Sequence, residues 1–490
     1  MNGPAVFQAL TGRAFVLHDG RQSWDASQVA AAARDLASGL APGAVVAVLA
    51  DNGPAWVTLD LACLAAGAVH LPLPAFFTPA QLRHALDSAG AGVAFTDRPE
   101  VLEALDGGFA RRGEWQGLVR LERRVAAPAL PAGTAKISFT SGSTGAPKGV
   151  CLRAEGLLST ASALVNALAP VPLARHLAVL PLALLLENVA GVYAPLLRGM
   201  GVHLPPLASL GWRGMAGFDP ALLDAAVRQT RVQSLILVPE LLKAWCGHLA
   251  GGGGRGPDGV RFVAVGGAAC APQLIQAARA LGVPAHQGYG LTECGSVVCL
   301  NLPGQDQPDS VGRPLAHAAL HLDETGEVHV ATPAFAGYLG MPETAATSFA
   351  TGDLGRLDDA GCLHLAGRRK HLLITAFGRN VAPEWPESLL NAQREVAQSL
   401  VLGEGRPYLA ALLVPRPGLD EAGLAAAVDR VNAQLPDYAR IGAWRAVPPF
   451  TLAEGLATGN GRPIRTAITA RYGTWADELY RLKENAHDLH

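Results

Sequence analysis

The sequence has little charge, and its charges are balanced. Only 16% of the 490 residues are Asp, Glu, Lys or Arg, against a usual share of about 25%. The 39 basic and 41 acidic side chains give a formal net charge of −2. Nucleic-acid binding is excluded on this ground, because such proteins carry a basic surface. Half of the residues are apolar, which argues against extended disorder and predicts a large buried core.

The sequence also lacks paired cysteines. Its seven cysteines are scattered, and no two of them form a Cys-x-x-Cys motif, so a disulfide framework and a zinc site are not expected. A continuous apolar run that could span a membrane is missing, because the most apolar segment, 178–197, contains Glu187, Asn188 and two prolines. The N-terminus has no cationic start and no signal-peptide run. We therefore expect a cytoplasmic protein with no membrane span.

Short apolar runs alternate with helical patterns over most of the chain. VVAVLA at 45–50 precedes an amphipathic stretch, and so do the later runs SLILVP and VRFVAVGG. This alternation is typical of βαβ units and predicts an α/β fold with mostly parallel sheets flanked by helices. The length predicts more than one domain. After about residue 367, short strands and one long helical stretch near 417–435 predict a smaller α+β domain.

The segment FTSGSTGAPKG (139–149) places four hydroxyl side chains and two glycines before a Pro-Lys-Gly ending. Glycines let backbone N–H groups turn inward and form a nest for anionic oxygens. The segment is not a Walker A loop, because Lys148 lies between Pro147 and Gly149. A polar linker would explain the glycines and hydroxyls but not the ending. We interpret the segment as a polyphosphate cradle whose ligands are Thr140, Ser141, Gly142, Ser143, Thr144, Gly145 and Lys148.

This loop closely resembles the phosphate loop of the adenylate-forming (AMP-binding) superfamily, and other segments resemble its further motifs in the same order. GYGLTECGS (288–296) resembles the Tyr-Gly-x-Thr-Glu motif, and VGGAACAP (265–272) resembles the segment that lines the adenine pocket. The resemblance implies that Thr292 contacts phosphate and that Glu293, with Thr140, holds Mg²⁺, a hard cation that oxygen ligands suit. The nucleotide-binding residues that it implies here are Gly266, Gly267, Ala268, Tyr289, Gly290 and Thr292.

The segment ATGDLGRLDDAGCLHLAGRRK (350–370) resembles the ribose-binding region of the same family. Asp353 would accept hydrogen bonds from the ribose hydroxyls, and Arg368 would support it. The family's hinge falls at Lys370, between an N-terminal AMP-binding domain (1–369) and a small mobile C-terminal domain (370–490). Taken alone, Asp353 could be a turn residue and Arg368 a solvated charge.

The segment ITAFGRNVAPEWPE (374–387) resembles the loop that the family's small domain swings towards the acyl carbonyl. Gly378 would leave room for a pantetheine arm, since only glycine lets another chain approach so closely. Arg379 and Asn380 would line the same thiol channel.

Two positions depart from the family pattern. The last motif, FTLAEGLATGNGRPIR (450–465), has Arg462 where a catalytic lysine is usual. Arginine keeps the charge but is a planar fork, so adenylation could be slowed or Arg465 could contribute. Leu184 stands where relatives commonly have a histidine or aromatic residue. An aliphatic wall at 184–186 is consistent with an apolar acyl chain, although such a stripe is more often plain core.

By this resemblance the protein is an acid–thiol ligase of the adenylate-forming fold, similar to long-chain acyl-CoA synthetases. It would join a carboxylic acid, fatty or otherwise apolar, to ATP with Mg²⁺, release pyrophosphate, and pass the acyl group to CoA. The physics is in-line phosphoryl transfer by positioning and charge neutralisation. Two alternatives stay open: a ligase that loads the phosphopantetheine of an acyl carrier protein, and a catalytically weakened nucleotide-binding relative.

Overall fold

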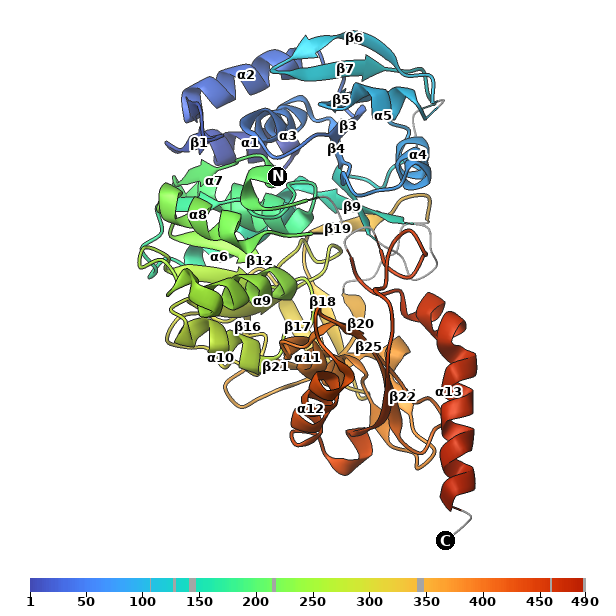
Figure 1. The fold of residues 1–490 in the computed structure, drawn as a ribbon. Helices are drawn as coiled ribbons and strands as arrows, with labels where there is room; N and C mark the ends of the chain where they lie inside the picture. The colour runs from blue at the N-terminus through green and yellow to red at the C-terminus, as the bar shows by residue number, and fades with distance from the viewer. Residues whose placement is uncertain are drawn as a thin grey trace.

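The computed structural model describes residues 1–105, 107–126, 129–140, 147–213, 217–341, 348–458 and 461–487. In Figure 1 the N-terminal lobe forms the upper, larger part of the molecule, and the C-terminal lobe lies below it in orange and red. We define the N-terminal lobe as the described residues of 3–368 and the C-terminal lobe as those of 373–487. The short 3₁₀ helix η4 (Arg369–His371) joins the two lobes.

One large sheet of the N-terminal lobe contains eight strands in the order β19-β9-β8-β4-β3-β5-β7-β6. Its interior pairs β5-β3, β3-β4 and β4-β8 are parallel, and its outer pairs are antiparallel. Its strands are β3 (Val45–Leu49), β4 (Val69–Pro72), β5 (Val93–Thr96), β6 (Ala110–Trp115), β7 (Leu118–Glu122), β8 (Thr134–Thr140), β9 (Lys148–Arg153) and β19 (Phe335–Tyr338). The helices before and between them are α2 (Ala26–Ser38), α3 (Pro54–Ala66), α4 (Pro79–Ser88) and α5 (Pro99–Glu103).

The second large sheet contains nine strands in the order β16-β15-β14-β13-β12-β10-β11-β1-β2. Its strands are β1 (Val16–His18), β2 (Ser23–Asp25), β10 (Arg175–Leu177), β11 (Gly201–His203), β12 (Ser234–Leu237), β13 (Phe262–Val265), β14 (Ala285–Tyr289), β15 (Cys299–Leu300) and β16 (Arg313–Pro314). The accompanying helices are α1 (Gly3–Thr11), α6 (Ala154–Ala167), the π-helix η1 (Glu187–Tyr193), α7 (Ala194–Arg198), η2 (Leu207–Leu210), α8 (Pro220–Thr230), α9 (Pro239–His248), η3 (Leu249–Gly253) and α10 (Pro272–Ala280).

Apolar packing joins the two large sheets through helices. Most of α3 is buried, and one cluster contains its residues together with Val46 of the first sheet and Leu17 and Val202 of the second. Parallel strands need a crossover connection, usually a helix, so alternating strands and helices produce layers of this kind. The predicted α/β class with helix-flanked sheets is therefore what the N-terminal lobe shows.

The N-terminal lobe ends in a smaller antiparallel sheet. Its strands lie in the order β17-β18-β20-β21, and the last of them leads directly into η4. They are β17 (Ala319–Leu322), β18 (Glu327–Ala331), β20 (Phe349–Leu357) and β21 (Leu363–Arg368).

The C-terminal lobe has a three-stranded sheet, β24-β25-β26, and a hairpin, β22-β23. Residues of β25 contribute to two separate apolar clusters. The strands are β22 (Leu373–Ile374), β23 (Asn380–Val381), β24 (Val396–Leu402), β25 (Leu409–Pro415) and β26 (Ile441–Ala446). The helices are α11 (Glu384–Ala392), α12 (Glu421–Asn432), η5 (Asp437–Ala439) and α13 (Arg465–His487).

The sequence analysis found α12 but missed α13, the red helix at the right of Figure 1. A signal was present, because Ile468, Tyr472, Trp475, Ala476 and Leu479 recur at the spacing of one helical face. All five belong to an apolar cluster that also contains residues of β24 and β25.

In the described part of the chain, no helix combines the length and the apolar character that crossing a membrane requires.

Candidate active site

Neighbouring strands hold the two ends of the predicted phosphate cradle. Thr140 is the last residue of β8 and pairs with Lys148, the first residue of β9. Gly149 packs closely on Leu339, since an added Cβ would lie 3.0 Å from that side chain. The other predicted ligands lie outside the described residues, so their role stays a prediction; they are Ser141, Gly142, Ser143, Thr144 and Gly145.

Tyr338, at the end of β19, connects Lys148 with Glu293. The Lys148 Nζ atom lies 5.8 Å from the centre of the Tyr338 ring, and the Tyr338 hydroxyl donates a 2.9 Å hydrogen bond to Glu293 Oε1. Burial and the Glu293 carboxylate raise the pKa of Tyr338, which keeps its hydroxyl protonated. The sequence analysis missed Tyr338, because it lies outside every motif and only sheet pairing brings it here.

The turn after β14 places Thr292 and Glu293 at the surface of the site. Both side chains are partly exposed. The turn folds back so tightly that a Cβ on Gly290 would lie 1.6 Å from the Ser296 carbonyl oxygen. Only glycine fits there, so the Tyr-Gly-x-Thr-Glu pattern has a steric reason as well as a chemical one.

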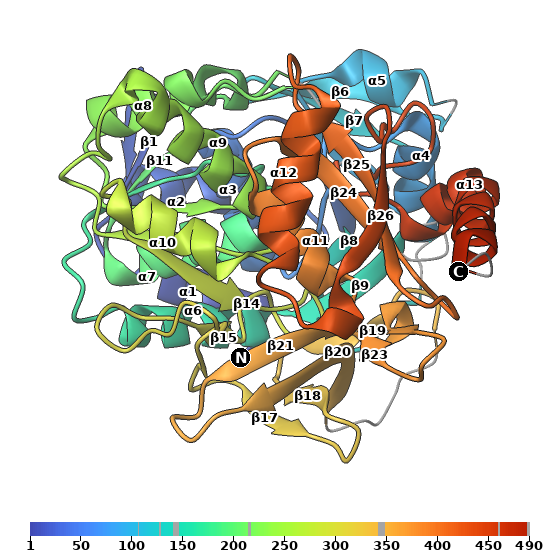
Figure 2. The same cartoon turned by 60° about the horizontal axis from the view of Figure 1, so that its bottom comes forward.

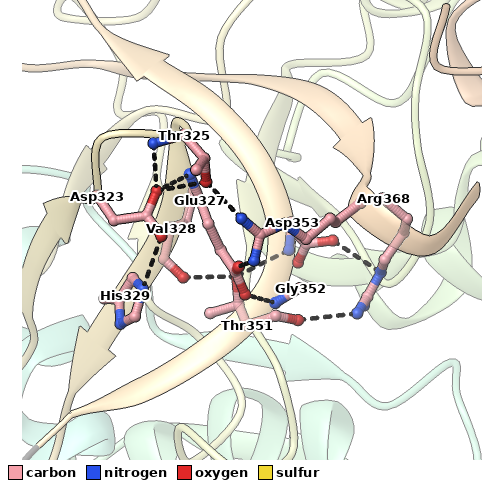
Figure 3. A network of polar contacts seen from close by, with 10 residues as sticks. Asp323, Thr325, Glu327, Val328, His329, Thr351, Gly352, Asp353 and Arg368 are labelled. Carbon is pink, nitrogen blue, oxygen red and sulfur yellow. Dashed lines mark hydrogen bonds and ion pairs between the residues drawn. The ribbon is translucent and has the colours of Figure 1, made fainter. Parts of the chain in front are cut away.

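Asp353 of β20 lies between Tyr289 and Arg368. Figure 3 shows its contact with Arg368. Its Oδ2 accepts a 2.6 Å hydrogen bond from Tyr289, and its Oδ1 lies 2.7 Å from Arg368 Nε. Arg368 also donates a 3.0 Å bond to the Thr351 carbonyl oxygen. Burial raises the pKa of Asp353, and Arg368 and Tyr289 oppose that rise. Each carboxylate oxygen has a further lone pair for a ribose hydroxyl.

Glu327 of β18 ties the same sheet to the start of η4. Its Oε1 accepts a 2.9 Å bond from Gly352 N, and its Oε2 pairs with the Arg369 guanidinium. Arg369 also donates a 2.6 Å bond to the Thr325 hydroxyl. Figure 3 shows Glu327 between the Asp353 strand and the turn that carries Thr325. The residue just before Lys370 is therefore fixed to the N-terminal lobe.

The predicted hinge residue, Lys370, lies exposed in η4. Burial lowers its pKa, and the charges of Arg368 and Lys148 lower it further, while Asp353 opposes them. Lys370 is therefore within electrostatic reach of the phosphate and ribose residues. On its other side, His371 Nδ1 lies 2.5 Å from Glu384 Oε1 of α11.

The predicted adenine segment follows β13, where Gly266 N donates a 3.1 Å bond to the Leu237 carbonyl oxygen. Gly267 has a left-handed backbone, with φ of +81°, and its carbonyl oxygen accepts a hydrogen bond from Arg462 Nη2. Ala268 is partly exposed beside it. The structure thus brings Arg462, from the other lobe, to the predicted nucleotide site.

Arg465 does not take that place. Its guanidinium donates a 2.7 Å bond to the Val401 carbonyl oxygen and pairs with Glu387 of α11. The sequence analysis left open that Arg465 could assist adenylation. In this structure Arg465 is bonded within the C-terminal lobe, and a part in adenylation stays a prediction.

The predicted thiol-channel residues lie on the β22-β23 hairpin. Gly378 has φ of +69°, nothing lies within 4 Å of the place that a Cβ would take, and Arg379 and Asn380 are exposed. Phe377, at the tip, is 75% exposed. Among the described residues, no hydrogen bond or ion pair joins these side chains to the nucleotide residues above.

The apolar segment at 180–188 is held by buried polar side chains. Asn52 donates a 2.9 Å bond to the Leu180 carbonyl oxygen and accepts a 2.8 Å bond from the Leu182 amide. Glu187 is fully buried and accepts a 2.9 Å bond from the Leu180 amide. Leu184 is only partly buried and packs at the edge of an apolar cluster. The departure at Leu184 therefore lies on a firmly held segment.

A second buried network was missed from the sequence. Lys136 of β8 is 1% exposed, and its Nζ lies 2.9 Å from Asp60 Oδ2 of α3. Tyr193 donates a 2.9 Å bond to the same oxygen, and His70 Nδ1 lies 2.8 Å from Asp60 Oδ1. Burial works to raise the pKa of Asp60, but Lys136 and His70 hold it well below its usual range. The network fixes β8, which leads to Thr140.

Comparison with known families gives two matches. A family model described as AMP-binding enzyme matches residues 8–339. A second, described as AMP-binding enzyme C-terminal domain, matches residues 370–484.

Two curated relatives show the range of similar proteins. A sulfoacetate–CoA ligase of Cupriavidus necator is 30% identical over 439 residues, which cover 82% of this chain and 81% of that protein. The long-chain-fatty-acid–CoA ligase 1 of Homo sapiens is 27% identical over 516 residues, with 85% of this chain and 73% of that protein covered.

Solved structures with the same fold cover nearly the whole chain. An anthranilate CoA ligase in complex with anthranoyl-AMP has a TM-score of 0.80 and 20% identity, with 97% and 98% of the two chains covered. An O-succinylbenzoate CoA synthetase from Bacillus subtilis, in complex with ATP and a magnesium ion, has a TM-score of 0.71 and 21% identity, with 95% and 98% covered. The predicted fold class is confirmed.

Proposed function

This chain belongs to the AMP-binding enzyme family, and from that membership we propose that it activates a carboxylic acid with ATP and transfers the acyl group to the thiol of CoA. Two observations support the proposal: Lys148 and Glu293 lie on either side of Tyr338, and the charges of Lys148 and Asp353 both act on the pKa of Lys370. A cation, a partly exposed carboxylate and a buried carboxylate suit triphosphate, metal and ribose, respectively.

In the first half-reaction, a carboxylate oxygen attacks the α-phosphorus of ATP, and pyrophosphate leaves. We assign neutralisation of the phosphate charge to Lys148, with Thr292 as a hydroxyl donor, and orientation of the ribose to Asp353. Arg462 is assigned to the reacting carboxylate and α-phosphate. In-line transfer of this kind needs positioning and electrostatic stabilisation rather than a protein nucleophile.

We assign a Mg²⁺ site to Glu293 and Thr140. The residues fit the ion, because a carboxylate and a hydroxyl are hard oxygen ligands, and Glu293 uses only Oε1 towards Tyr338 while its side chain stays partly exposed. When bound, the ion supplies charge neutralisation at the phosphate oxygens.

In the second half-reaction, the thiol sulfur attacks the acyl carbonyl and AMP leaves. We propose domains of 1–369 and 370–490 with the hinge at Lys370, since Arg369 is bonded to β18 and His371 to α11. Rotation there would bring Gly378, Arg379 and Asn380 to the site.

The acid is proposed to be apolar, supported by the aliphatic stretch at 184–186. A cytoplasmic location stays a prediction.

The test is acid-dependent ATP–pyrophosphate exchange over a panel of apolar and polar acids, followed by AMP release with CoA or with a phosphopantetheine-loaded carrier protein. We expect exchange with apolar acids and turnover with CoA. Turnover with the carrier protein alone would show that the acceptor is its phosphopantetheine thiol and not CoA. Calorimetry that finds no binding of MgATP to folded protein would refute the proposed function.

A Lys148→Ala variant tests the assignment of the phosphate cradle. We expect the KM for ATP to rise while the melting temperature without ATP stays within about 2 °C, because Lys148 is exposed. Lys148→Arg, which keeps the charge, is the matched control. A large fall in the melting temperature would show that Lys148 is structural.

A further inference from the structure

Lys243 of α9 crosses from the N-terminal lobe to the C-terminal lobe. Its Nζ donates hydrogen bonds to the carbonyl oxygens of Gln393 (2.7 Å), Val396 (2.8 Å) and Asn391. An ammonium group has three donors, and all three are used here. Lys243 belongs to none of the family motifs described above.

The three acceptors lie where α11 ends and β24 begins. The last carbonyl groups of a helix have no partner within the helix and carry partial negative charge. Gln393 is the C-terminal cap of α11, so Lys243 caps one lobe's helix from the other lobe. A cation at this position is favourable, because it donates hydrogen bonds to the unpaired carbonyl groups and is attracted by their partial negative charge.

The acidic side chains Glu240 and Glu395 attract Lys243, but neither forms an ion pair with it among the described residues. Glu395, from the C-terminal lobe, is taken by Arg430 (2.8 Å) and Arg394 (3.0 Å). Within the described residues, no ion pair includes Lys243. The carbonyl groups are therefore its partners, and they are in place only when α11 lies against α9.

The surroundings of Lys243 also act on its pKa. Burial lowers the pKa of Lys243 to about 7, and the charge of Arg416 works in the same direction. Glu240 and Glu395 oppose that fall. A measurement that needs the ammonium form is therefore made below pH 7.

Two more contacts join the lobes on the same side. Gln273 of α10 donates a 2.7 Å bond to Gln434, just after α12. Ala271 is 3% exposed and packs in the apolar cluster of the C-terminal lobe. Figure 2 shows α11 and α12 beside α9 and α10. The same arrangement carries Arg462 to Gly267.

We propose that Lys243 is a positioning residue for acyl-adenylate formation: by capping α11 it holds the C-terminal lobe in the arrangement that places Arg462 at the nucleotide site. This rests on the proposed two-step function. A rotation about Lys370 would separate α11 from α9 and break all three bonds. Lys243 then serves the first half-reaction and is not needed in the second.

The first test measures lobe docking without any activity, at pH 6.5. Gln273→Cys and Gln434→Cys place two thiols on side chains that are in contact and exposed, while the native cysteines are all buried. In this background, Lys243→Met should slow cross-linking by a short bis-maleimide about tenfold, since three charge-assisted bonds are lost. Unchanged cross-linking would overturn the proposal.

The second test separates the two half-reactions. Lys243→Met should lower acid-dependent ATP–pyrophosphate exchange about tenfold, while transfer from supplied acyl adenylate to CoA stays within about twofold. An equal loss in both would show a merely structural role. Lys243→Gln, which keeps two N–H donors, should restore part of the cross-linking and also serves if the Met variant does not fold.

The two proposals fail differently. If the parent protein shows no exchange with any acid, the proposed function fails, but the cross-linking rates still decide whether Lys243 holds the lobes together.

Discussion

At the scale of single residues, the site combines groups of opposite charge that lie far apart in sequence. Lys148 and Glu293 meet at Tyr338, and Asp353 meets Arg368 across a strand pair. Arg462 comes from the other lobe and donates to a backbone carbonyl oxygen. Arg462, predicted to stand where the family pattern has lysine, therefore keeps a cation at the predicted nucleotide site, but part of its guanidinium group bonds to the protein backbone.

The role of Arg462 gives the first prediction. Arg462→Ala should lower ATP–pyrophosphate exchange about 100-fold, because a cation at developing phosphate charge typically contributes a few kcal/mol. Thiol transfer from supplied acyl adenylate should change little. Rapid-quench measurement of each half-reaction checks this, with Arg471→Ala on α13 as the control. Equal rates for Arg462→Ala and the parent would contradict the assignment.

At the scale of secondary-structure elements, a buried polar network anchors a strand that leads to the site. Lys136 and Asp60 join β8 to α3, and Tyr193 adds η1. Burial lowers the pKa of Lys136, and Asp60 opposes that change. A buried ion pair contributes little net stability, but the loss of one partner is costly because it leaves the other charge buried.

The buried pair gives the second prediction. Lys136→Met should lower the free energy of unfolding by about 3–5 kcal/mol, since it leaves the Asp60 carboxylate uncompensated. The double variant Lys136→Met with Asp60→Asn should recover a large part of that loss. Urea unfolding of the three proteins measures the coupling. A double variant no more stable than the single one would show that packing, not charge, causes the loss.

The hinge anchor gives the third prediction. Arg369→Ala removes the bonds to Glu327 and Thr325, so η4 should open more often. A protease that cleaves after lysine should then cut after Lys370 several-fold faster, without a change in melting temperature beyond about 3 °C. Arg112→Ala, which removes an arginine of β6 that is 60% exposed in its side chain, is the control. An unchanged cleavage rate would mean that Glu327 does not anchor the hinge.

At the scale of the whole molecule, several histidines are neutral in the folded protein. Burial lowers the pKa of His203, His286 and His317 from 6.5 to about 4. Between these pH values the unfolded chain binds protons that the folded chain does not. Stability therefore rises with pH across this range and is lost as the pH falls below 6.5.

This linkage gives the fourth prediction. Between pH 6.5 and 4 the three histidines together should lower the unfolding free energy by up to about 4 kcal/mol per pH unit. Denaturant unfolding at a series of pH values measures the slope. His317→Gln should reduce the slope of unfolding free energy against pH by about the contribution of one bound proton. If the slope of the His317→Gln variant equals that of the parent, other groups cause the pH dependence of stability.

The sequence alone predicted most of the candidate site residues that loops and strand ends carry, and their roles stay predictions. Gly290 and Thr292 are recognisable because a tight turn and phosphate chemistry constrain adjacent positions, so their signal is local. The alternation of strands and helices likewise predicted the α/β class, because the periods of 2 and 3.6 residues are properties of the chain itself. The apolar face of α13 follows the helical period too, so this helix could have been predicted from the sequence.

Only the tertiary structure decided which distant side chains meet. Tyr338, Glu327 and Lys243 have no signal of their own in the sequence, and each acts through a partner brought near by sheet pairing or lobe docking. Nothing within a few residues of Lys243 shows that three carbonyl groups at the end of α11 accept hydrogen bonds from it. Long-range contacts of this kind depend on the summed packing of the whole chain, and local sequence does not encode that sum.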